Sequence, residues 1–230
     1  MLYAIGDPHL SLSGDKPMSV FGPRWAGHPE KIRENWEKTV KPGDTVVVNG
    51  DISWAMKLRC AAPDLDFINS LPGQKIFVLG NHDYWFTSKA KFNELYPDIF
   101  LLARGVFTRY KQYHLCGTKG WLCPGDAFFQ EERDRPLYDR EAGRLKMSLD
   151  AAMRDGAEDI IVITHFPLFA DKARASRFLE IIEEYPVRKA VYGHLHGASH
   201  KSALVGERGG VEFMLVSSDY VDFTPVRIVE

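Results

Sequence analysis

Five short segments of the 230-residue sequence carry aspartate, asparagine or histidine, and in four of them these residues lie beside one another or beside glycine. Their side chains offer carboxylate, imidazole and amide donors, which bind transition-metal ions such as Mn, Fe, Zn, Ni or Co. No cysteine thiolate accompanies them to select zinc. The residue types therefore predict a metal centre and leave the metal's identity open. The segments are Asp7-Pro8-His9, Gly50-Asp51, Gly80-Asn81-His82-Asp83, Thr164-His165 and Gly193-His194-Leu195-His196-Gly197.

The spacing within these segments suits chelation. Residues i and i+2 of an extended segment point the same way, so Asp7 and His9 can chelate one ion. By the same rule, His194 and His196 can serve one ion or two neighbouring ions. Glycines beside several ligands permit tight turns near a crowded centre. Seven side chains make a plausible set of direct ligands: Asp7, His9, Asp51, Asn81, His165, His194 and His196.

A structural alternative exists for the acidic and amide residues. Asp and Asn are favoured in turns beside glycine, and motifs as short as D-x-H or G-D arise often by chance. Turn chemistry does not explain why histidine recurs in four of the five segments. The joint metal interpretation is therefore favoured over five unrelated turns.

An apolar run precedes each segment and predicts a buried strand. The runs are rich in Val and Ile without strict alternation, which is typical of strands covered on both faces in an α/β protein. In such sheets, sites form outside the carboxyl ends of the strands, so ligands distant in sequence converge there. The expected strands are 2–5, 45–48, 75–79, 159–163 and 189–192, with further β-like runs at 211–217 and 226–229.

Several segments between these runs have apolar residues at helical spacing. We expect helices at 28–40, at 139–155, at 173–185 and in a short segment that Ser88 caps. The irregular stretch 117–136 is long enough for an active-site flap.

Composition narrows the class of protein further. Hydrophobic residues at 45%, charged residues at 26% and a net charge of −2 indicate one globular domain over 1–230. Interleaved charges argue against binding to long nucleic acid or to a membrane surface. Three cysteines without a C-x-x-C pair argue against a disulfide framework, and with no apolar leader they favour a cytoplasmic location. The sequence leaves the oligomeric state open.

The ordered motifs D-x-H, G-D, G-N-H-[DE], H and G-H-x-H closely resemble those of the calcineurin-like metallophosphoesterase superfamily. That resemblance implies two mixed β-sheets packed as a sandwich flanked by helices, a four-layer αββα arrangement. It implies two divalent ions, and a hydroxide bridging them would attack phosphorus. One ion would be held by Asp7, His9, Asp51 and His196, and the other by Asp51, Asn81, His165 and His194. The resemblance also places His82 near the leaving group, with Asp83 orienting it.

A narrower resemblance links Gly50–Met56, Gly80–Trp85 and Gly117–Trp121 to small bacterial predicted phosphohydrolases. Phosphoprotein phosphatases carry G-D-x-V-D-R-G, whereas Trp54 and Ala55 stand here at the D-R positions, which disfavours a phosphoprotein substrate. Three aromatic residues directly follow ligand motifs: Trp54, Tyr84 and Trp85. They either pack in the core or stack on the organic part of a substrate. We therefore expect a small phosphorylated substrate, with a diester or nucleotide-like compound weakly preferred over a monoester.

Two alternatives belong to other classes of protein. The same fold can serve as a catalytically silent scaffold that binds a protein partner, although silent members should have lost metal ligands. A metallo-β-lactamase-like hydrolase requires H-x-H-x-D-H on one loop, and the sequence lacks that motif.

Overall fold

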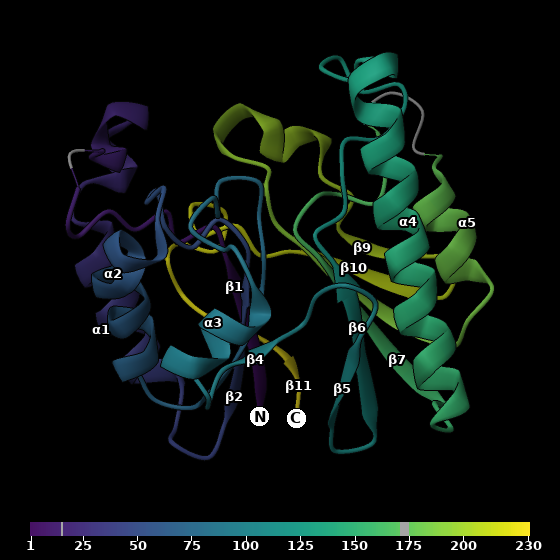
Figure 1. Ribbon diagram of the computed structural model, residues 1–230, viewed down its shortest axis with the longest axis horizontal. Coiled ribbons are helices and arrows are strands. Elements are labelled where there is room, and N and C mark those ends of the chain that lie inside the picture. Colours follow the sequence, from purple (N-terminus) through teal and green to yellow (C-terminus); the bar gives the residue numbers. More distant parts are fainter. Residues whose placement is uncertain (15, 171–174) are drawn as a thin grey trace. The chain divides into compact units, whose positions relative to one another are not determined.

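The computed structural model describes residues 1–14, 16–170 and 175–230. They form two compact units, each built round one mixed β-sheet (Figure 1). Unit 1 comprises Met1–Leu101 and Val216–Glu230, and unit 2 comprises Leu102–Leu215. The predicted α/β class, with two mixed sheets and accompanying helices, is confirmed. The single domain expected over 1–230 stays a prediction.

The sheet of unit 1 has the strand order β11-β1-β2-β3-β4. Strands β1 to β4 run parallel, and β11 pairs antiparallel with β1. All residues of β1 and β2 are buried, as the unbroken Val and Ile runs predict. The strands are β1 (Leu2–Gly6), β2 (Thr45–Asn49), β3 (Gln74–Val78), β4 (Phe100–Leu101) and β11 (Val226–Val229).

The register of this sheet aligns the ends of its central strands. Gly6 pairs with Asn49, and Asn49 pairs with Val78, so β1, β2 and β3 end in one row. The residues that follow the row therefore emerge at one edge of the sheet.

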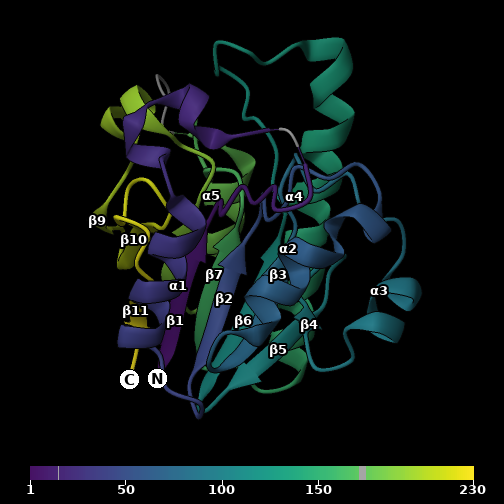
Figure 2. The ribbon, with the colours of Figure 1, turned by 90° about the vertical axis from the view of Figure 1, so that its left-hand side faces the viewer.

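Helices α1 and α2 lie side by side on one face of the unit 1 sheet, as Figure 2 shows. Trp36 of α1 is fully buried, and its indole N–H donates to the Pro72 carbonyl at 2.9 Å. Ser88 caps α3 as predicted, because its hydroxyl accepts the Lys91 N–H at 3.3 Å. The helices of unit 1 are the short 3₁₀ helices η1 (Met18–Phe21) and η2 (Pro23–Trp25), then α1 (His28–Thr39), α2 (Leu58–Ser70) and α3 (Lys89–Leu95).

The sheet of unit 2 has the order β5-β6-β7-β8-β10-β9, with parallel strands between two antiparallel edge strands. Thr118, Thr164 and Tyr192 pair across β6, β7 and β8, so these strands also end in one row. The strands are β5 (Phe107–Tyr110), β6 (Tyr113–Thr118), β7 (Asp159–Thr164), β8 (Val187–Tyr192), β9 (Gly206–Arg208) and β10 (Val211–Leu215).

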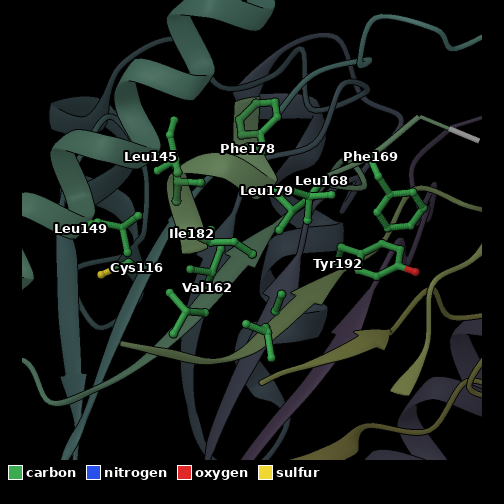
Figure 3. Packing of buried hydrophobic residues seen from close by; sticks show 14 of the residues in the cluster. Cys116, Leu145, Leu149, Val162, Leu168, Phe169, Phe178, Leu179, Ile182 and Tyr192 are labelled. Carbon is green, nitrogen blue, oxygen red and sulfur yellow. The ribbon is translucent and has the colours of Figure 1, made fainter. Parts of the chain in front are cut away.

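Helices α4 (Glu131–Arg154) and α5 (Arg177–Glu183) lie together on one face of the unit 2 sheet (Figure 1), and η3 spans Gly197–Ser202. The rings of Tyr138 and Phe178 join the two helices edge to face at 5.2 Å. Beneath them lies an apolar core that includes Leu145, Leu149 and Val162 (Figure 3). The core fixes the strands whose ends carry the histidines of this unit.

Several boundaries differ from the sequence-based expectations. Helix α4 begins at Glu131 rather than at residue 139, so about a third of the expected 117–136 flap is helical. Helix α5 begins at Arg177 after the Ser176 cap, and positions 173 and 174 of the expected helix lie outside the described residues. Helix α2 and the hairpin of β5 and β6 were not predicted. Pro63 inside α2 removes one backbone hydrogen bond, which masks the helical pattern in the sequence.

Candidate functional site

Two predicted ligand segments of unit 1 run beside each other beyond the strand ends. The backbone N–H of Asp7 donates to the Gly50 carbonyl at 3.0 Å, and that of His9 donates to the Asp51 carbonyl at 2.9 Å. Asp7 and His9 each offer a ligand atom, and these atoms lie within 4.8 Å of each other. The loops after β1 and β2 thus form one backbone-bonded platform.

The conformation of this platform is strained. The φ values are 54° for Asp7, 46° for His9 and 48° for Asp51, all in the left-handed region. This corrects the extended geometry that we expected for the Asp7–His9 pair. Non-glycine residues in this region cost on the order of 1 kcal/mol or more each, and such residues cluster at functional sites. Among the described residues, eight non-glycine residues have positive φ, and four of them are predicted ligands, the fourth being His194 at 72°.

The side chains of Asp51 and His9 face each other in unit 1. The Asp51 Oδ2 atom lies 3.8 Å from His9 Nε2, and its Oδ1 atom accepts the His82 backbone N–H at 2.7 Å. Asp7, His9 and Asp51 are all at most 3% exposed, whereas Asn81 is half-buried. Two buried carboxylates and a buried imidazole fit a divalent cation, because a cation offsets the charge that burial penalises.

Gly80 lets the loop after β3 approach Asp51. A Cβ atom at this position would meet Asp51 Oδ1 at 2.1 Å and Asp51 N at 2.3 Å. No side chain fits in that space, so only glycine brings the Asn81-His82 segment beside Asp51.

Asp83 holds the two loops together. Its Oδ1 atom accepts the backbone N–H groups of Ile52 at 2.8 Å and Ser53 at 3.3 Å, and its Oδ2 atom accepts the Gly80 N–H at 2.8 Å. Burial, followed by the negative charge of Asp51, raises the pKa of Asp83 to about 6. Its hydrogen bonds come from backbone amides and the Trp85 indole rather than from the His82 imidazole, so Asp83 positions His82 through the backbone.

Aromatic rings surround His9 and His82. The Trp54 ring stacks on His9 with centroids 4.8 Å apart, and it lies 4.3 Å from the His82 ring. Trp25 approaches His9 edge-on at 6.0 Å. Trp54 and His82 are half-buried, and Tyr84 is exposed with its ring edge-on to His82 at 6.3 Å.

Trp85 does not line this site. Its side chain is fully buried, and its indole N–H donates to Asp83 at 2.9 Å. Its ring packs near Phe92 at 5.9 Å. The structure therefore assigns Trp85 to packing, in place of the substrate contact considered from the sequence.

The remaining three predicted ligands lie in unit 2, at the ends of β7 and β8. His165 directly follows β7, and its carbonyl accepts the Gly193 N–H at 3.0 Å. The rings of His165 and His194 meet edge to face at 5.1 Å, with ligand atoms within 4.8 Å of each other. His196 is half-buried and precedes η3, where its carbonyl accepts the Ser199 N–H at 3.0 Å.

Two residues near His9, Trp25 and His28, were not predicted as functional from the sequence. Trp25 is 4% exposed, and His28 is 7% exposed with Nδ1 3.2 Å from the Trp25 carbonyl. Burial lowers the pKa of His28. Trp25 lies in the aperiodic 11–27 region and His28 begins α1, so only their proximity to each other in sequence hinted at a shared role.

The two buried cysteines lack the features of a nucleophile. Burial raises the pKa of the Cys116 and Cys123 thiols to about 12, so both stay protonated at neutral pH.

Among the described residues, no helix has the length and apolar composition needed to cross a membrane.

Comparisons with known proteins cover most of the chain. A family model described as calcineurin-like phosphoesterase matches residues 2–198. The Gene 66 protein of Mycobacterium phage D29 is 25% identical over 186 residues, covering 80% of this chain and 74% of that protein. The crystal structure of phosphopantetheinyl hydrolase from Mycobacterium tuberculosis has the same fold, with a TM-score of 0.56, 16% identity and coverage of 99% and 96%. A protein of unknown function from Aquifex aeolicus, AQ665, aligns with a TM-score of 0.49, 19% identity and coverage of 98% and 94%.

Proposed function

The chain belongs to the calcineurin-like phosphoesterase family and is a metal-dependent phosphoric ester hydrolase, and we propose that it works with two divalent ions held by seven side chains. Asp51 belongs to both ligand sets in this proposal. One set adds Asp7, His9 and His196, and the other adds Asn81, His165 and His194. The observation that carries the proposal is backbone strain, because Asp7, His9, Asp51 and His194 all adopt positive φ.

Two bound ions would supply an activated water nucleophile and neutralise charge on the phosphate. The chain's own residues hold the geometry. The His82 N–H fixes one oxygen of Asp51, and the Asp83 carboxylate ties the Ile52 and Gly80 amides together. The His82 imidazole is half-buried beside Trp54, where we assign it the donation of a proton to the departing alcohol oxygen.

The proposed substrate is a small organic phosphoester, with a diester or nucleotide-like compound preferred over a monoester. Trp54 and Tyr84 support this preference because their rings flank His82 and offer aromatic surface beside the proposed proton donor. The net charge of −2 disfavours long nucleic acid as a partner, and we propose no membrane partner. Free thiols at all three cysteines support a reducing, cytoplasmic location.

A substrate panel tests this proposal. Under Mn²⁺, the rates for bis-p-nitrophenyl phosphate, p-nitrophenyl phosphate, a cyclic nucleotide, a phosphopantetheinyl ester and a phosphopeptide are compared. The phosphopantetheinyl ester is included because a solved structure with this fold is named for its hydrolysis. We expect a small ester to be turned over fastest. Faster turnover of the phosphopeptide would overturn the substrate class, and activity on monoesters alone would reverse the diester preference.

A further inference from the structure

Two adjoining pockets of unit 1 share Ser11 and Lys16. The larger has a volume of about 330 Å³ and is lined by Met18, Trp25 and His28 among others. The smaller has a volume of about 150 Å³ and is lined by Trp54, Cys60 and Asp64 among others. We call the two together the Lys16 groove. A cavity of about 150 Å³ accommodates one six-membered ring.

The Lys16 groove adjoins the proposed metal ligands. Its two tryptophans, Trp25 and Trp54, contact His9 from different sides, at 6.0 Å edge-on and 4.8 Å stacked. Each pocket is therefore lined by a tryptophan that contacts His9, to which we assign metal binding. At 4.3 Å, Trp54 also contacts His82, to which we assign proton donation.

The charge of the groove is set by Lys16. Its Nζ atom lies 5.1 Å from the centroid of the Trp54 ring, and it forms no ion pair within the described residues. The nearby Asp64 carboxylate is directed elsewhere, because it accepts the Leu12 N–H at 2.7 Å and the Ser53 hydroxyl at 2.5 Å. Within the described part of the chain, the groove thus combines aromatic walls with an ammonium group that forms no ion pair.

We infer that the Lys16 groove binds the organic leaving group of the substrate and that Lys16 binds a second anionic group on it. The substrate class is a phosphoester whose alcohol carries a planar ring and a carboxylate or further phosphate. This inference rests on the proposed function, since the scissile phosphate must sit at the metal ligands. Lys16 acts as a specificity residue: its ammonium distinguishes anionic leaving groups from neutral ones.

A matched pair of substrates tests the inference. The ratio of kcat/KM for 4-carboxyphenyl phosphate to that for phenyl phosphate is measured in the wild type, Lys16→Met and Lys16→Arg. We expect Lys16→Met to lower the ratio about 3- to 10-fold, because an ion pair at a partly exposed site contributes little more than that. Lys16→Arg should restore most of it. Lys89→Met is the control, because Lys89 makes a similar exposed contact, 5.6 Å from the Phe100 ring, outside the groove. An unchanged ratio in Lys16→Met overturns the inference.

A second measurement does not need turnover. Cys60 lines the groove and is exposed, whereas Cys116 and Cys123 are buried, so thiol reagents label one position. We expect the ratio of labelling rates for an anionic and a cationic methanethiosulfonate to fall about 3- to 10-fold in Lys16→Met and to stay constant in Lys89→Met. We also expect 4-carboxybenzylphosphonate to protect Cys60 more than benzylphosphonate does. A charge-independent labelling rate, or equal protection by both phosphonates, overturns the inference even in an active enzyme. If Cys60 labelling depends on reagent charge through Lys16 but the protein hydrolyses no phosphoester, the result contradicts the proposed function and not the anion-binding role of Lys16.

Discussion

The backbone N–H of His82 donates to Oδ1 of Asp51 at 2.7 Å. This bond joins the loop after β3 to the loop after β2 at the residue that we assign to both metal ligand sets. Asp83 reinforces the joint by accepting the Ile52 and Gly80 amides at 2.8 Å each. The orientation of the Asp51 carboxylate therefore depends on two backbone loops as well as on its own strand.

Gly80→Ala should weaken metal binding. The added Cβ atom would meet the Asp51 carboxylate oxygen at 2.1 Å and would force the two loops apart. We expect the Kd for Mn²⁺ to rise about 10- to 100-fold, which is the usual effect of losing the contacts that orient a metal-binding side chain. Isothermal titration calorimetry measures this Kd. Gly43→Ala is the matched control, because its Cβ atom would meet nothing within 4 Å. Equal affinities in the two variants would show that the close approach is unimportant.

His82→Ala should retain metal and lose turnover selectively. Protonation of the leaving oxygen matters most when the departing alkoxide is strongly basic. We expect kcat to fall roughly 100- to 10,000-fold for an alkyl phosphoester and far less for a p-nitrophenyl ester. Steady-state kinetics with both substrates, together with elemental analysis, provides the test. Equal losses would argue against proton donation, and loss of metal would make His82 a ligand.

The positions of the proposed ligands were predictable because they depend on local sequence and strand register. Asp7 and His165 directly follow β1 and β7, and the parallel register brings such positions to one edge of each sheet. The Lys16 groove was not predictable, because it arises in the aperiodic 11–27 region through contacts with residues about forty positions away, such as Trp54. The burial of Trp85 was also not predictable from the sequence. Its two neighbours in sequence are exposed or half-buried, whereas its own ring lies in the core.

Lys75 should make the free energy of unfolding depend on pH in the alkaline range. Lys75 is 4% exposed, and its ammonium donates to the carbonyls of Asn69, at 3.1 Å, and Leu71. Burial lowers the pKa of this ammonium to about 8. Between about pH 8 and the unfolded pKa near 10.4, the unfolded chain binds more protons, so the free energy of unfolding rises with pH. Urea unfolding at pH 7.5 and 9.5 should show the wild type gaining about 1 to 2 kcal/mol relative to Lys75→Met. A constant difference between the two proteins would exclude this titration.

Gly143→Ala should stabilise unit 2. Gly143 lies inside α4, where glycine costs about 0.5 to 1 kcal/mol relative to alanine. A Cβ atom there would meet nothing within 4 Å outside the helix backbone, so no clash offsets the gain. Thermal unfolding should show a higher Tm for the variant, with unchanged metal content. A lower Tm would mean that α4 packs more tightly at this position than the structure shows.

Metal stoichiometry tests the central claim most directly. The chain is reconstituted with Mn²⁺, freed of excess ion, and analysed for metal per polypeptide alongside Asp51→Ala and Asp51→Asn. Because Asp51 is assigned to both ligand sets, we predict two ions per wild-type chain and fewer than one in Asp51→Ala, with hydrolysis of p-nitrophenyl esters abolished and the circular dichroism spectrum retained. Well under one ion per wild-type chain, or full metal content in both Asp51 variants, would contradict the proposed two-metal centre.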